Sequence, residues 1–171
     1  MIEVGSAIHT STAAPEAFFE RWVDLPTHPE WASSMEWFDV ETPVVVGTRG
    51  TSKARAAEPL SFRVTALEEP FVYADTTELD GAELTVHHEA RPSADGTRVE
   101  MRAWLEGPRA GEHEMAIRAS LERALPADLT ALVALVEGRS IKDGEAMSLD
   151  PNRAGPGAHR PPVLEEPEPN P

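Results

Sequence analysis

Residues 22–38, WVDLPTHPEWASSMEWF, hold three of the chain's four tryptophans together with two prolines. Proline lacks the backbone N–H that a helix interior requires, so this segment cannot form one continuous helix. We expect Pro26 to end a first helix and Pro29 to lie just inside a second, over about residues 27–33. The two helices would form a V whose apex holds Trp22, Trp31 and Trp37.

The residues before this stretch predict a strand followed by the first helix. Residues 2–11 alternate with a period of two, which is typical of a strand with one apolar face. The residues predicted for that face are Ile2, Val4, Ser6 and Ile8. From Thr12, which can cap a helix, the apolar residues recur at helical spacing. This helical stripe consists of Phe18, Phe19, Trp22 and Val23.

After Met35 the period is again close to two, and it predicts a series of antiparallel strands. The expected strands lie near residues 35–41, 48–55, 60–67, 71–79, 82–91 and 97–106. Turn-forming residues at 68–70, 79–81 and 93–96 join neighbouring strands as hairpins. A long amphipathic helix is then predicted from about Glu112 to Glu137. Its apolar stripe consists of Ile117, Leu121, Leu125, Leu129, Leu132 and Val136.

This order of elements predicts an α+β fold in which a curved seven-stranded antiparallel sheet wraps around the long C-terminal helix. Only that helix is long enough to cover the inner face of the sheet, and the two short helices would fill the remaining gap. We assign residues 1–139 to one domain. Residues 140–171 are rich in Pro and Glu and poor in large apolar residues, so we expect a disordered acidic tail. Its removal should leave thermal stability unchanged.

The sequence also resembles the START-like (SRPBCC) superfamily. The resemblance rests on APEAFFERWVDLPTHPEW (residues 14–31), on the glycine-marked strand VVVGTRGTSKA (44–54) and on the amphipathic final helix. Its most specific part is the pattern D-x-x-x-x-P-x-W, formed by Asp24, Pro29 and Trp31. The superfamily, which includes polyketide cyclases and lipid-transfer domains, has a helix-grip fold. The resemblance implies a hydrophobic cavity between the sheet, the short helices and the C-terminal helix.

We expect such a cavity to be lined by inward-facing residues of the strands and helices. The predicted ligand-binding residues are Trp31, Met35, Trp37, Phe62, Val64, Tyr73, Thr77, Leu84, Val86, His88, Met101, Ile117 and Leu121. The tryptophans also have a simpler interpretation as core-filling side chains, because each buries a large apolar area.

Two of these residues, His88 and Tyr73, are also candidates for acid–base chemistry. On strand 82–91, alternation places His88 on the same face as Leu84 and Val86, and therefore in the interior. A neutral imidazole there could bind a ligand carbonyl or transfer a proton. It could equally be a core histidine that bonds to Tyr73, a threonine or the backbone.

The direction of strand 71–79 is ambiguous from its sequence. One face holds Tyr73, Asp75 and Thr77, and the other is also partly apolar. If the first face points inward, Tyr73 and Thr77 would join His88 as polar groups of the cavity. An inward Asp75 would be costly unless it were paired.

Composition restricts the classes of partner. The chain has 30 acidic and 15 basic residues, a net charge of −15, and residues 140–171 account for −3 of it (six acidic, three basic). The remaining −12 repels phosphate backbones and anionic lipids, so we expect neither nucleic-acid binding nor membrane insertion. The sequence has no cysteine and no long apolar segment, and residues 1–11 lack the basic start and apolar run of a signal peptide. We expect a cytoplasmic monomer or weak homodimer.

No motif for a nucleotide, a cofactor or a serine nucleophile is present, and we expect no cofactor. Acidic residues flank His113 in GEHEM (111–115), but consecutive helical residues diverge, so we expect no metal site. Three functions remain open. The first is binding of a small hydrophobic molecule such as a polyketide, lipid or isoprenoid-like compound. The others are a polyketide cyclase or aromatase that uses His88 as acid–base, and a non-catalytic regulatory or co-chaperone-like domain.

Overall fold

The computed structural model describes residues 1–138, and the tail predicted for residues 140–171 lies outside the described residues. The helices are α1 (Pro15–Val23), the 3-10 helix η1 (Leu25–Glu30) and α2 (Ala110–Val136). The strands are β1 (Ile2–Ser11), β2 (Met35–Val40), β3 (Arg49–Ala54), β4 (Leu60–Glu68), β5 (Val72–Leu79), β6 (Ala82–Ser93) and β7 (Gly96–Glu106). Within the described residues, no helix is long and apolar enough to cross a lipid bilayer.

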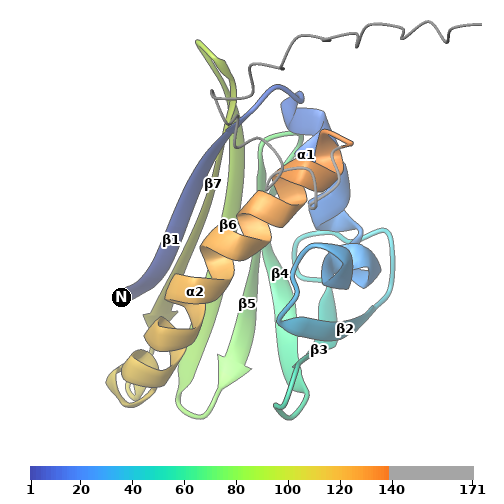
Figure 1. The fold of residues 1–171 in the computed structure, drawn as a ribbon. Coiled ribbons are helices and arrows are strands. Elements are labelled where there is room, and N and C mark those ends of the chain that lie inside the picture. Colours follow the sequence, from blue (N-terminus) through green and yellow to red (C-terminus); the bar gives the residue numbers. More distant parts are fainter. Residues whose placement is uncertain (139–171) are drawn as a thin grey trace, which may run out of the picture.

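All seven strands form one sheet in the order β1-β7-β6-β5-β4-β3-β2, with every neighbouring pair antiparallel. Figure 1 shows α2 crossing one face of the sheet, and α1 and η1 lying beside it on the same side. Helix α2 packs mainly against β1, while η1 packs against β2. The predicted fold is therefore confirmed.

The proline-rich segment differs from its prediction in detail. The second helix begins at Leu25 instead of Thr27, so Pro26 lies in its first turn. A missing N–H costs little at that position because the first turn has no intrahelical acceptor for it. Pro29 lies inside η1, and the element is a short 3-10 helix. The segment still breaks into two separate helices, α1 and η1, as the two prolines predicted.

The predicted inward face of β1 is wrong in the second half of the strand. Its register shifts between Glu3 and Gly5, which marks a β-bulge. A bulge inverts the alternation beyond it, so Val4 is fully buried whereas Ile8 is 59% exposed. Gly5 then faces α2, where an added Cβ would lie 3.0 Å from Leu125 Cδ1. The bulge thus presents small residues to α2 and lets the helix approach β1 closely.

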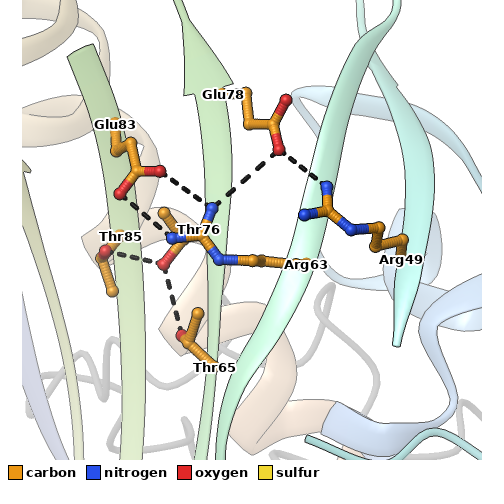
Figure 2. Close-up of polar contacts among 7 residues, drawn as sticks. All are labelled: Arg49, Arg63, Thr65, Thr76, Glu78, Glu83 and Thr85. Carbon is orange, nitrogen blue, oxygen red and sulfur yellow. Dashed lines mark hydrogen bonds and ion pairs between the residues drawn. The ribbon is translucent and has the colours of Figure 1, made fainter. Parts of the chain in front are cut away.

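The outer face of the sheet carries an ordered polar layer (Figure 2). The two guanidinium nitrogens Nη1 and Nη2 of Arg63 donate to the Glu83 carboxylate oxygens at 2.9 and 3.1 Å. Arg63 is paired across the strands with Thr76, whose hydroxyl lies 2.9 Å from that of Thr85. Thr76 and Thr85 are buried although they lie on the outward side. Long charged side chains therefore cover this face and leave the opposite face to the helices.

Candidate functional site

A cavity of about 370 Å³ lies between the sheet, η1, the segment that follows η1, and α2. Nine of the thirteen predicted ligand-binding residues lie on its wall: Trp31, Met35, Thr77, Leu84, Val86, His88, Met101, Ile117 and Leu121. They come from five separate elements and from the loop after η1. The fold thus gathers most of the predicted set around one partly open cavity. Contact of these residues with a ligand stays a prediction.

Four predicted residues are not on this wall. Trp37 follows a bulge in β2, where the register shifts between Met35 and Trp37, and Phe38 takes the inward position instead. Phe62 and Val64 are each 1% exposed and belong to the packed core. Both belong to the hydrophobic core cluster, and the ring of Phe62 lies 5.7 Å from that of Phe38, which takes the place on the wall.

Tyr73 is the fourth of these residues. Its side chain is completely buried, and its hydroxyl donates a hydrogen bond of 2.9 Å to Asp75 Oδ2. Burial, together with the neighbouring carboxylate, raises the pKa of Tyr73 well above its usual value. The Tyr73 hydroxyl therefore holds the Asp75 carboxylate in place and does not line the cavity, and a catalytic role of Tyr73 stays a prediction.

Strand β5 resolves the ambiguity of its sequence. Asp75 and Thr77 face the cavity, so the Tyr73 side of the strand is the inner one. The Asp75 carboxyl is removed from bulk water, which raises its pKa to about 6, and the Tyr73 hydrogen bond opposes this only in part. At neutral pH the cavity wall therefore carries a carboxylate that protonates more readily than an exposed aspartate.

His88 is 3% exposed, lines the cavity, and has a buried Nδ1 without a hydrogen-bond partner among the described residues. Its ring lies 5.5 Å from that of Trp22 and 5.4 Å from that of Tyr73. Burial, with smaller contributions from His28 and His87, lowers the pKa of His88 to about 3, and a hydrogen bond to the Tyr73 backbone opposes this only in part. The imidazole is therefore neutral at physiological pH, and its Nδ1 can accept or donate one hydrogen bond, depending on the tautomer.

Four ionisable residues of the wall were missed by sequence reasoning, namely His28, Arg55, Glu58 and Asp128. His28 of η1 is buried, its Nε2 lies 2.9 Å from the Trp22 carbonyl, and burial lowers its pKa to about 4. Asp128 of α2 is 6% exposed and accepts a 3.2 Å hydrogen bond from the Ser33 backbone N–H. Burial raises the pKa of Asp128 to about 6. A signal existed only for Asp128, which interrupts the apolar stripe of its helix three residues after Leu125.

A second hollow and possible metal sites were compared with this cavity. A more open hollow of about 530 Å³ lies beside α1, walled by residues such as Phe19, Val44 and Leu67. None of the predicted site residues contributes to it. Among residues 1–138, no group of three or more His, Asp or Glu side chains is placed to hold a metal ion. The cavity with Asp75 and His88 is therefore the candidate site.

No protein-family model and no curated protein matches the sequence. Among solved structures, the chain is similar to protein MLL2253 from Mesorhizobium loti, with a TM-score of 0.62 and 18% identity over 80% of this chain and 98% of that one. It is also similar to Ara h 8.0201, with a TM-score of 0.57 and 14% identity over 78% and 97% of the two chains.

A third similar structure is StfQ, a di-domain ARO/CYC protein of the steffimycin biosynthetic pathway. The TM-score is 0.59 and the identity 14%, over 84% of this chain and 52% of that one. At these identities the likeness concerns the fold. The chain has the helix-grip fold of START-like proteins, which its sequence resemblance predicted.

Proposed function

We propose that the protein binds a small, largely apolar molecule in the cavity between the sheet and α2. The observation that carries this proposal is the cavity itself, because about 370 Å³ within a packed domain is space for a ligand rather than a packing defect. Its wall combines apolar side chains such as Leu84 and Val86 with a few polar groups. Such a combination holds an apolar body and fixes its orientation through one polar end.

Binding of N-phenyl-1-naphthylamine, a neutral apolar dye, tests the proposal directly. Ala124 is half-buried on the cavity wall, so Ala124→Phe should fill the cavity and weaken dye binding at least tenfold. The matched control is Ala127→Phe, because Ala127 is exposed on the same helix and does not line the cavity. Circular dichroism would verify that both variants fold.

Equal dye binding by wild type and Ala124→Phe would place the dye elsewhere and contradict the proposal. A wild-type protein that binds no dye and shows no co-purifying molecule by native mass spectrometry would also contradict it.

An acid–base enzyme is a second candidate, favoured by one observation. The neutral imidazole of His88 and the carboxyl of Asp75 lie on the same cavity wall. We propose that this pair could assist enolisation of a bound ketone, as in a polyketide cyclase or aromatase, and the likeness to an ARO/CYC protein supports the idea. Under this proposal, deuterium exchange at the methyl group of 2-acetylnaphthalene in D₂O is faster with wild type than with His88→Gln. Equal rates would refute it.

A further inference from the structure

The charge on the cavity wall is strongly unbalanced. Its ionisable residues are His28, Arg55, Glu58, Asp75, His88 and Asp128, which comprise three carboxyl groups and one guanidinium. The Arg55 Nε donates to the backbone carbonyl of Ser33. Asp75 receives a hydrogen bond from a tyrosine hydroxyl and Asp128 from a backbone N–H. In residues 1–138 neither of these two aspartates is paired with a cationic side chain.

This arrangement differs from that of the outer surface, where acidic residues are paired across strands. Examples are the bonds from Arg63 to Glu83 and from Arg49 to Glu78 (Figure 2). A carboxylate that is removed from water without a counter-ion is costly, whereas one that meets a cation there is stabilised. Within residues 1–138, Asp75 therefore has no cationic partner of the kind that Glu78 and Glu83 have on the outer face.

His88 provides a second and independent indication. In the β5–β6 register, Asp75 is opposite Val86 and Tyr73 is opposite His88. Asp75 and His88 are thus diagonal neighbours on the inward face, with backbones about 7–8 Å apart. The His88 side chain is 97% buried on the cavity wall, and its Nδ1 has no partner among the described residues. An ammonium group carries several N–H donors and could bond to both residues from within the cavity.

The surroundings of this pair favour a cation in two further ways. Trp31 and Phe38 line the same cavity, and aromatic faces attract cations where water is excluded. Residues 1–139 carry 24 acidic and 12 basic side chains, a net charge of −12. The resulting field raises the local concentration of cations and opposes entry of carboxylates.

We infer that the cavity accepts an apolar molecule that carries a protonated amine, with the ammonium group bound between Asp75 and His88. This inference rests on the proposed ligand-binding function and names its chemical class. The apolar body of the ligand occupies the space between Leu84 and the stripe of α2. A fatty acid of similar size is disfavoured, because its carboxylate would lie beside Asp75.

Three probes of nearly the same shape test the inference: 1-naphthylmethylamine, 1-naphthylmethanol and 1-naphthoate. Isothermal titration calorimetry at pH 7.5 and low salt would give their dissociation constants. We expect the ammonium probe to bind at least tenfold more tightly than the alcohol, and the carboxylate probe to bind most weakly. The variant Asp75→Asn should reduce the preference for ammonium over alcohol to about one. The control Asp39→Asn removes an exposed carboxylate from β2 and should preserve the preference.

The outcomes separate this inference from the function on which it rests. Equal affinities for the three probes, or a preference that survives in Asp75→Asn, would overturn the ammonium assignment. If N-phenyl-1-naphthylamine still bound in the cavity, the ligand-binding function would stand without it. The assignment would also fail if none of the three probes bound while the neutral dye did. Failure of all four compounds to bind would overturn both.

Discussion

Replacing Asp75 by Asn should make the protein more stable at neutral pH, although the Asp75 carboxylate accepts the hydrogen bond of a buried hydroxyl. The wild-type carboxyl is removed from water and has no cationic partner among the described residues. Burial raises its pKa from 3.8 to about 6, so the folded protein holds this proton more tightly than the unfolded chain does. Asparagine keeps an oxygen that can accept the Tyr73 hydrogen bond but carries no charge.

The magnitude follows from the difference between the folded and unfolded pKa values. One pH unit corresponds to about 1.4 kcal/mol, so ionised Asp75 lowers the free energy of unfolding by about 3 kcal/mol at pH 8. Because the folded pKa is the higher one, this cost decreases as the pH falls through 6. It is about 1 kcal/mol at pH 4.5 and vanishes below the unfolded value. The stability gain of Asp75→Asn should therefore decrease by about 2 kcal/mol between pH 8 and pH 4.5.

Urea unfolding followed by tryptophan fluorescence, at pH 8, 6 and 4.5, measures this difference for the two proteins. The comparison removes the effects of the other buried groups. His28 and His88 have lowered pKa values and destabilise the folded state as the pH falls below about 6.5, but both proteins share them. A gain that does not vary with pH, or a loss of stability at pH 8, would refute the reasoning that Asp75 is a partly buried carboxylate without a cationic partner in residues 1–138.

Two further changes test the packing of the sheet. Gly50→Ala should lower the free energy of unfolding by about 1–3 kcal/mol. The added Cβ would lie 2.6 Å from the Asp39 carbonyl oxygen and 2.8 Å from the Phe62 ring, which is too close for either. An unchanged midpoint of urea unfolding would contradict this prediction. Arg63→Met removes a partly exposed ion pair with Glu83 but keeps an aliphatic side chain on the outer face. We expect the free energy of unfolding, measured by urea or thermal unfolding, to fall by less than about 1 kcal/mol. A loss above about 2 kcal/mol would show that the charge itself stabilises this face.

Much of the architecture is encoded in local sequence patterns. Strands and helices differ in the period of their apolar residues, so β4, β6 and α2 could be located from the sequence to within a few residues. Pro26 and Pro29 exclude one continuous helix over residues 22–38, so a break there could be predicted without knowledge of the tertiary fold. The inward direction of His88 also followed from alternation, because β6 shows no register shift against its two neighbours.

The candidate site depended on tertiary structure wherever alternation was interrupted or uninformative. Bulges in β1 and β2 reversed the faces that simple counting predicted, exposing Ile8 and replacing Trp37 by Phe38 on the cavity wall. The inward position of Asp75 came from packing of the whole sheet, since both faces of β5 are partly apolar. His28 lies in a short 3-10 helix, whose six residues are too few to show a period of apolar residues that would predict the direction of its side chain.

Sequence alone thus determined which segments are strands and helices, because a side-chain period is a local property of a segment. The tertiary structure was needed to show which polar groups share one cavity and which of them have no partner within residues 1–138. These properties depend on how distant segments meet, and the cost of leaving Asp75 without a cation arises only where the sheet, η1 and α2 together exclude water.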